Sequence, residues 1–229
     1  MITHMTARPR GRRRIALAVG ALGIGMTAVA PAAAEGQTAA PAPAPDRATV
    51  SVNAKRHTLS GDRVKFSGKL SSGEAGRRVA IKRRSGDSYV TLARTKTRAG
   101  GRYSVKWRAG RKGSFIVRAD VARDGDKPAA AKRLRGRMRV YVPRHASYYG
   151  PGLYGNKLAC GGTLTPGTVG VAHKSLPCGS RVTLRNRGRT LTVRVIDRGP
   201  YVGGRFYDLT EATKRKLRFG STGNVWSTK

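Results

Sequence analysis

The chain has 229 residues, of which 47 are Lys or Arg and 11 are Asp or Glu, so its net charge is +36. Residues 47–143 hold +21 of this excess and residues 144–229 hold +12, which excludes a basic tail as its source. The length allows one large domain or two small ones. Such a charge attracts polyanions such as nucleic acid, anionic lipid or phosphate-rich polymers, and it is equally typical of general surface solvation.

The N-terminus has the pattern of an export signal. Five arginines between Arg8 and Arg14 precede the apolar run 15–30, which is too short to span a bilayer as a stable helix. Ala32–Ala34 then supply the small residues that a signal peptidase requires. We therefore predict a signal peptide over residues 1–34, a secreted protein and no transmembrane segment after cleavage; the alternative is an uncleaved anchor.

Two segments follow before the last third of the chain. Residues 35–46 alternate proline with alanine, which predicts a semi-extended linker. Residues 47–142 contain seven short alternating runs separated by Gly and Asp turns, which predicts an immunoglobulin-like β-sandwich. We expect a structural or adhesive spacer here, with polyanion binding as the alternative. The predicted strands are Val50–Val52, Val64–Leu70, Val79–Ile81, Tyr89–Leu92, Tyr103–Trp107, Phe115–Val121 and Met138–Val142.

A second domain is predicted over residues 145–229, after a boundary at residues 143–145. It contains short strands at Val182–Leu184 and Leu191–Ile196 and one helix from about Leu209 to Leu217. The helix has Asp208 as its expected cap, Glu211 at the spacing of a capping box, and Gly220 as its stop. The whole chain is therefore predicted to be all-β with one short helix.

Cys160 and Cys178 are the two cysteines of the chain. In an oxidising exterior, an isolated close pair of cysteines forms a disulfide, and a loop of this length contributes about 3 kcal/mol. A metal site would need histidine partners, and His145 and His173 show no ligand spacing. We therefore expect the bridge, and neither a metal nor a cofactor.

Asp197 stands apart from the other carboxylates of this domain. It ends the apolar strand Leu191–Ile196 and is followed by a sharp turn at residues 198–201. A carboxylate at the end of a strand, beside an arginine and a turn, is placed to face a cleft. The alternative is an ordinary turn-capping aspartate.

Four segments closely resemble the rare lipoprotein A (RlpA) family in order and spacing: Ala146–Gly150, Val171–Val182, Val195–Arg205 and Asp208–Thr210. The resemblance covers roughly residues 145–229 and implies a double-psi β-barrel. Residues 160–162 and 176–179 also resemble the expansin side of the same superfamily. The resemblance implies a domain that binds peptidoglycan glycan strands and, in some members, cleaves them as a lytic transglycosylase.

In that reaction a carboxylic acid protonates the glycosidic oxygen, and the sugar's own hydroxyl attacks, so that an anhydro end forms without addition of water. One carboxyl serves first as acid and then as base, whereas an ordinary hydrolase uses two at a fixed separation. Asp197 matches the aspartate assigned this role in related barrels. The resemblance therefore implies a peptidoglycan lytic transglycosylase, a polysaccharide lyase, with Asp197 as acid/base.

Six other residues are predicted to bind substrate: Tyr149, His173, Lys174, Arg198, Tyr201 and Asp208. Structural alternatives exist for most of them. His173 is equally typical of the core edge, the tyrosines of barrel packing, and Asp208 of a helix cap. Arg198 either pairs with Asp197, which would disfavour a general acid, or binds a carboxylate of the substrate.

The sequence departs from the family at one important position. Catalytic members carry a glutamate in the segment 159–164, where this chain has Gly162. This favours the alternative of a non-catalytic, expansin-like protein that binds glycan and loosens the wall. No cysteine lies near the predicted cleavage site, so we expect a released or wall-held protein.

The expected partner is peptidoglycan, and anionic wall polymers are a further candidate. A nucleic-acid binder is a third hypothesis, but it rests on charge alone. The chain lacks a recognition pattern of interleaved aromatic and basic residues, and the export signal also argues against this hypothesis. We expect no specific nucleic acid.

Overall fold

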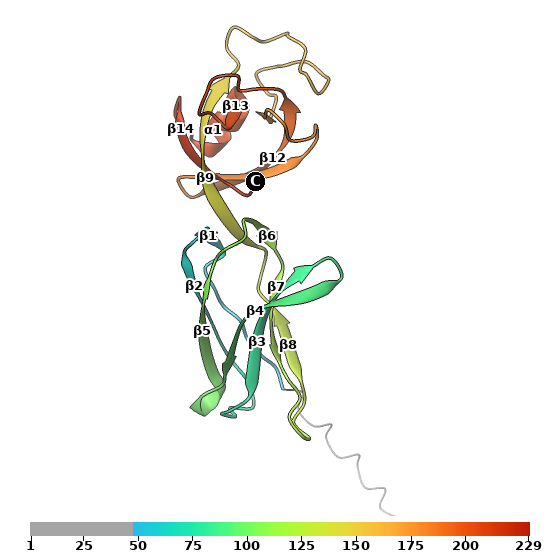
Figure 1. Ribbon diagram of the computed structural model, residues 1–229, viewed down its shortest axis with the longest axis vertical. Helices are drawn as coiled ribbons and strands as arrows, with labels where there is room; N and C mark the ends of the chain where they lie inside the picture. The colour runs from blue at the N-terminus through green and yellow to red at the C-terminus, as the bar shows by residue number, and fades with distance from the viewer. Residues whose placement is uncertain (1–47) are drawn as a thin grey trace, which may run out of the picture. The chain divides into compact units, whose positions relative to one another are not determined.

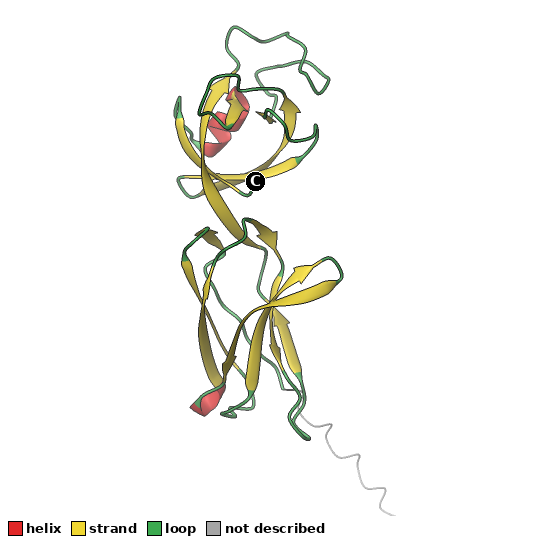
Figure 2. Cartoon of the chain, in the orientation of Figure 1, coloured by secondary structure: helices red, strands yellow, loops and turns green. Residues whose placement is uncertain are grey.

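The computed structural model describes residues 48–229, whose regular structure is β-strand except for one short α-helix and one 3-10 turn, η1 (Ala99–Gly101) (Figures 1 and 2). The mostly β class is therefore confirmed. The predicted signal peptide and linker lie outside the described residues. Among the residues that are described, none of the helices is long and apolar enough to cross a membrane.

The N-terminal part of the described chain contains two antiparallel sheets. One pairs β2 with β5, and the other has the order β4-β3-β7-β8. Side chains of both sheets, such as Phe66, Tyr103, Ile81 and Val117, meet in one buried core. The strands are β1 (His57–Leu59), β2 (Arg63–Lys69), β3 (Arg78–Ser85), β4 (Ser88–Lys96), β5 (Arg102–Arg108), β6 (Gly113–Phe115), β7 (Val117–Val121) and β8 (Ala130–Arg133).

Two strand predictions in this part need correction. The segment Val50–Val52 is not a strand, because this stretch makes only isolated bridges, at Val50 and Asn53. The predicted strand Phe115–Val121 is two strands that separate at Ile116. The separation has a clear cause: β6 pairs with β9, whereas β7 pairs with β3 and β8, so the chain changes partners at this residue.

Six strands close into a barrel in the C-terminal part. Going around the ring, the order is β9-β13-β10-β12-β11-β14, and β14 pairs with β9 again. The pairs β9–β13 and β10–β12 are parallel, and the other four are antiparallel. Inward side chains, including Val171, Val195 and Leu209, form the barrel core. The strands are β9 (Met138–Tyr149), β10 (Val171–Ala172), β11 (Arg181–Asn186), β12 (Arg189–Asp197), β13 (Tyr207–Thr210) and β14 (Gly223–Ser227).

Strand β9 belongs to both sets of strands. Its first residues pair with β1 and β6, and its later residues pair with β13 and β14. The predicted boundary at residues 143–145 therefore falls inside a continuous strand, with Pro143 in register with Trp226.

The helix α1 (Glu211–Leu217) begins two residues later than predicted and has different caps. Thr210 is the N-cap, since its hydroxyl accepts from the Thr213 N–H, and Arg218 ends the helix in the left-handed conformation. The prediction that Asp208 caps the helix is wrong because Asp208 is still inside β13. Gly220 likewise lies beyond the true stop.

Candidate active site

A β-bulge places Asp197 at the end of β12. Val171 of β10 pairs with Val195, but the next residue, Ala172, pairs with Asp197, so Ile196 is the extra residue. A bulge changes the face to which the following side chain points. Asp197 is therefore in register with Ala172, whose side chain is a single methyl group.

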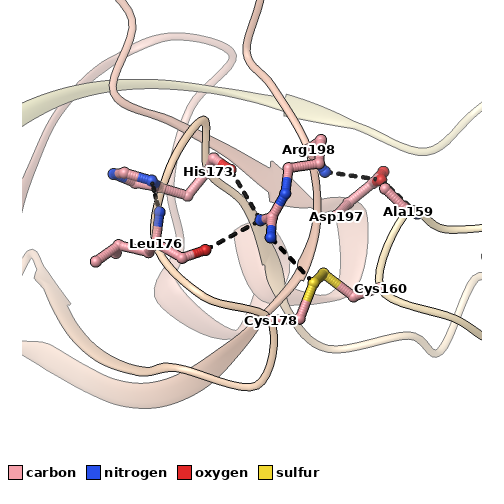
Figure 3. The surroundings of a disulfide bond; sticks show 7 residues. All are labelled: Ala159, Cys160, His173, Leu176, Cys178, Asp197 and Arg198. Carbon is pink, nitrogen blue, oxygen red and sulfur yellow. Dashed lines mark hydrogen bonds between the residues drawn. A yellow bond between two sulfur atoms is a disulfide. The ribbon is translucent and has the colours of Figure 1, made fainter.

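Two backbone amides fix the carboxylate of Asp197 (Figure 3). Its Oδ1 accepts a hydrogen bond from the Ala159 N–H at 2.9 Å and another from the Arg198 N–H at 2.9 Å. Among the described residues, Oδ2 accepts no hydrogen bond of normal geometry and no cation forms an ion pair with Asp197, while the Tyr149 hydroxyl lies beside the carboxylate. The arrangement orients the carboxylate through one oxygen and leaves the other free for chemistry.

The side chain of Arg198 points away from Asp197, so the alternative in which these two residues form an ion pair does not hold. Its Nη1 donates to the carbonyls of Leu176 at 3.0 Å and His173 at 3.3 Å, and its Nη2 donates to Cys178 Sγ at 3.1 Å (Figure 3). The carbonyls of the 173–178 loop converge on the guanidinium and hold it there. Arg198 thus supports the loop and leaves Asp197 without a salt bridge.

The predicted disulfide is confirmed: Cys160 and Cys178 are bonded, with their Cα atoms 5.5 Å apart. It joins the segment that carries Ala159 to the 173–178 loop that receives Arg198. A further hydrogen bond, from the Cys160 N–H to the Ile196 carbonyl at 3.2 Å, ties the same segment to the bulge. The bridge therefore fixes one of the two amides that orient Asp197.

A second carboxylate, Asp208, lies two strands away at the same level of the barrel. Ala172 pairs with Asp197 on one side and with Asp208 on the other. Paired residues on neighbouring strands present their side chains on one face, so both carboxylates share a face, with Cα atoms about 10 Å apart. Asp208 accepts a short hydrogen bond from the Ser147 hydroxyl, which occupies one of its oxygens.

Tyr149 completes this face. It lies two residues beyond Ser147 on β9, and its buried hydroxyl makes no hydrogen bond of normal geometry with the described residues. Burial raises the pKa of Tyr149 well above its ordinary value, and the charge of Asp197, the approach of the Tyr149 hydroxyl to that carboxylate and the charge of Asp208 raise it further. At neutral pH Tyr149 is therefore a neutral phenol with a proton to donate beside the two carboxylates.

His173 occupies the core edge, with only 6% of its surface exposed. Its Nδ1 accepts from the N–H groups of Ser175 at 3.0 Å and Leu176 at 2.9 Å, and its ring packs edge-on against Phe206. Burial, followed by the charges of Arg198 and Arg144, lowers the pKa of His173. The ring is thus a neutral support of the 173–178 loop.

Lowering the pH from 7.5 to 5.5 is expected to destabilise this fold. Burial and nearby arginines lower the pKa of His57 to about 4, and the pKa of His173 is also lowered. In this window the unfolded chain binds more protons at these histidines than the folded chain. The free energy of unfolding therefore decreases as the pH is lowered. Thermal unfolding should show a Tm loss of a few degrees that is smaller in His57→Asn and in His173→Asn. An unchanged pH dependence in both variants would contradict the assignment.

The remaining predicted residues are exposed. Tyr201 has 85% of its surface exposed, which excludes the alternative that it packs in the barrel. Lys174 is exposed and makes no hydrogen bond or ion pair in the part of the chain that the structure describes. Gly162 is exposed at a φ of +83°, with nothing within 4 Å of where a Cβ would lie. No neighbouring side chain therefore fills the place of the family glutamate.

The absence of a side chain at Gly170 leaves space for the side chain of Ile196 in the bulge. A Cβ on this glycine would overlap the side chain of Ile196, the extra residue beside Asp197. We expect Gly170→Ala to lower stability by about 1–3 kcal/mol, as overpacking does, and to displace Asp197. Gly167→Ala is the matched control, because its Cβ would meet only Thr165 Oγ1 at 4.0 Å. Denaturant unfolding of both variants measures the difference, and equal stability would contradict this role for Gly170.

Sequence reasoning missed several groups of this site. The Ala159 N–H carries no side-chain signal, and Ser147 was noticed only as part of the segment Ala146–Gly150. Thr210 and Thr213 bind the backbone of Gly170 through their hydroxyls, and so connect the start of α1 to β10. The available signal for this connection was the three-residue spacing of Thr210 and Thr213 at the start of the helix.

Residues 145–226 match the family model described as lytic transglycolase. The chain is 37% identical over 100 residues to the probable endolytic peptidoglycan transglycosylase RlpA of Synechocystis sp., covering 43% of this chain and 29% of that protein. It is 40% identical over 82 residues to the endolytic peptidoglycan transglycosylase RlpA of Campylobacter jejuni, covering 35% and 30%. Among solved structures, the Streptomyces papain inhibitor is similar at a TM-score of 0.31 and 24% identity, covering 38% of this chain and 90% of the inhibitor.

These matches concern one part of the molecule. The chain spans less than a third of the length of the two RlpA proteins, and the family model matches residues 145–226, where the barrel lies. The matched segment contains the closed ring of strands, the disulfide and Asp197. Residues 145–226 of this chain, which hold the barrel, are therefore similar to the lytic transglycolase family.

Proposed function

We propose that this protein binds peptidoglycan glycan strands and cleaves them as a lytic transglycosylase, with Asp197 as acid/base. The observation that carries the proposal is the state of the Asp197 carboxylate. One oxygen is held by two backbone N–H groups, while the other accepts no hydrogen bond of normal geometry and has no cation paired with it among the described residues, with the Tyr149 hydroxyl beside it. A carboxyl group held in this way has a fixed orientation, and no salt bridge occupies its second oxygen.

The cleavage needs one carboxyl group acting twice. Protonated Asp197 donates its proton to the glycosidic oxygen as the bond from that oxygen to the sugar carbon breaks. A hydroxyl of the same sugar then bonds to that carbon, and its proton passes to the Asp197 carboxylate, which regenerates the acid. The product carries an anhydro end and no water is consumed.

The neighbouring groups have different proposed roles. The neutral phenol of Tyr149 and the second carboxylate, Asp208, lie on the face of Asp197 and contact the sugar there. Tyr201 is exposed and offers a stacking surface, and Lys174 offers a free cation. His173 and Arg198 act indirectly, because their polar atoms already bind the 173–178 loop.

We further propose that the chain is secreted and acts at the cell wall. The predicted export signal supports the location, and the relatives' names support peptidoglycan as the substrate. Residues 47–142 are proposed to be an immunoglobulin-like sandwich that serves as a spacer, which is supported by two antiparallel sheets sharing a core.

A non-catalytic, expansin-like function is the second candidate. Gly162 favours it, since this residue lacks the family's carboxylate and no side chain approaches its Cβ position. Such a protein would bind the same glycan surface and loosen its packing without cutting it.

Digestion of purified, peptide-free glycan strands separates the two candidates. The proposed enzyme releases soluble fragments with anhydro ends, which mass spectrometry identifies. Sedimentation with insoluble glycan measures binding in parallel. Binding without fragments would establish the second candidate, and absence of both would contradict each of them.

A further inference from the structure

A strongly basic cleft lies apart from Asp197, within the compact unit formed by residues 45–229. Its volume is about 810 Å³, and its walls come from the end of β3, the segment leading into β6 and β6 itself, the start of β9, the barrel strands β11 and β12, and residues 228–229. Eight Lys and Arg residues line it, and no Asp or Glu side chain does. Six of these eight cationic residues are Arg83, Arg111, Lys112, Arg137, Arg139 and Arg181.

All but one of the cations of this cleft lack an anionic partner among the described residues. Of the eight, only Arg84 forms an ion pair within the described residues, with the fully exposed Asp87 at 3.3 Å. Arg139, the second residue of strand β9, has a buried Nε that makes no hydrogen bond with the described residues. A second hollow, of about 800 Å³ on the sheet of β3 and β7, differs in this respect: there Asp120 pairs with both Lys82 and Arg118. Of these two hollows, the basic cleft is thus the one with no carboxylate in its lining to neutralise its cations.

The geometry of the cations suits a chain of anions. Arg137 is held rigidly by Ser114, with Nε donating to Oγ at 2.8 Å and Nη2 to the carbonyl at 2.7 Å. Arg111, Lys112 and Arg181 are exposed and make no side-chain hydrogen bond in the described chain, so their donors are available. One guanidinium group can donate two parallel hydrogen bonds to a phosphate. The hydroxyls of Thr183 and Thr192 bond to each other at 2.9 Å, which leaves one of their two protons to donate to a polyol oxygen.

The cleft offers no open aromatic surface. Phe115 is its one aromatic residue, and the guanidinium of Arg83 lies over that ring at 5.3 Å. Neutral sugars and unpaired bases are held largely by stacking on exposed aromatic rings. Recognition in this cleft therefore depends on charge and hydrogen bonds, which disfavours both neutral glycan and single-stranded nucleic acid.

We propose that this cleft binds a polyol-phosphate polymer of the cell wall, a chain of phosphodiesters joined by hydroxylated units. The inference rests on the proposed function for its location, since a wall enzyme meets such polymers where it acts. Binding there would hold the protein on the wall through the cleft, while Asp197 remains free for glycan.

Binding of a labelled glycerol-phosphate oligomer to the purified chain tests the proposal. The variant Arg111→Gln/Lys112→Gln/Arg181→Gln removes three exposed cations of the cleft. Lys65→Gln/Lys106→Gln/Arg108→Gln is the matched control, because it removes three exposed cations from β2 and β5, outside the cleft. We expect the cleft variant to bind about 10-fold or more weakly and to lose about 2 from the slope of log affinity against log salt. The control should change affinity less than about 2-fold.

Three results would overturn the inference: equal losses in the two variants, no loss in the cleft variant, or tighter binding of a single-stranded DNA of equal charge. The assay requires no cleavage, so the two proposals fail separately. If wild type releases no glycan fragments but the cleft variant still loses polymer binding, only the proposed function fails.

Discussion

Replacing Asp197 with asparagine is expected to reduce the release of anhydro-ended fragments by about 10³-fold, within the range that general acid–base groups contribute. The amide keeps an oxygen for the N–H groups of Ala159 and Arg198, so the fold should remain intact. It has no acidic proton to donate to the glycosidic oxygen. The measurement is the initial rate of fragment release from peptide-free glycan, together with the Tm of the variant.

Asp208→Asn is the matched control for this result. Asp208 lies on the same face, but one of its oxygens accepts from Ser147, and we assign it to substrate binding. Its loss should lower the rate by less than about 10-fold, mainly through KM. If Asp197→Asn kept its activity, Asp197 would not be the acid. If both variants were equally inactive, the site would act through two carboxylates, as a hydrolase does.

Removing the disulfide is the second change with a large expected effect. Cys160→Ser/Cys178→Ser opens a bridge that spans 18 residues, which should cost about 3 kcal/mol of stability and lower the Tm by about 6–12 °C. Activity should fall as well, because the bridge fixes the segment whose Ala159 N–H orients Asp197. Thermal unfolding and fragment release measure the two effects.

A reducing agent supplies the control for this variant. It should bring the Tm of the wild type down to that of the double variant and leave the variant itself unchanged. A Tm that falls equally in both proteins on reduction would contradict the role of the bridge.

Local sequence patterns predicted the parts of the site that depend on neighbouring residues. The strand ending at Ile196 followed by a turn located Asp197, and the isolated pair of cysteines located the disulfide. The alternation of apolar residues also found most strands of the N-terminal part, but in the barrel it found only β11, β12 and the first residues of β9, and not β10, β13 or β14. The cap of α1 was misplaced by two residues, because Asp208, which has the right chemistry, is still paired in β13.

Contacts between distant segments decided the rest. The direction of Arg198 depends on carbonyls at residues 173 and 176, and the second bond to Asp197 comes from the backbone of Ala159. The bulge at Ile196 arises from pairing with β10, a two-residue strand with no pattern of its own. The full length of strand β9 was not predicted, because the strand changes partners midway. Its first residues pair with β1 and β6 and its later residues with β13, so one pattern of alternating apolar residues does not run through the whole strand.

Cleavage of the glycan in water enriched in oxygen-18 shows whether the proposed enzyme breaks the glycosidic bond without water. Asp197 and Asp208 share a face, so a hydrolase with two carboxylates is the competing mechanism. A lytic transglycosylase releases fragments with anhydro ends. Each fragment has the mass of the hydrolysis product minus one water and carries no oxygen-18. Fragments that carry oxygen-18 at a new reducing end would contradict this mechanism.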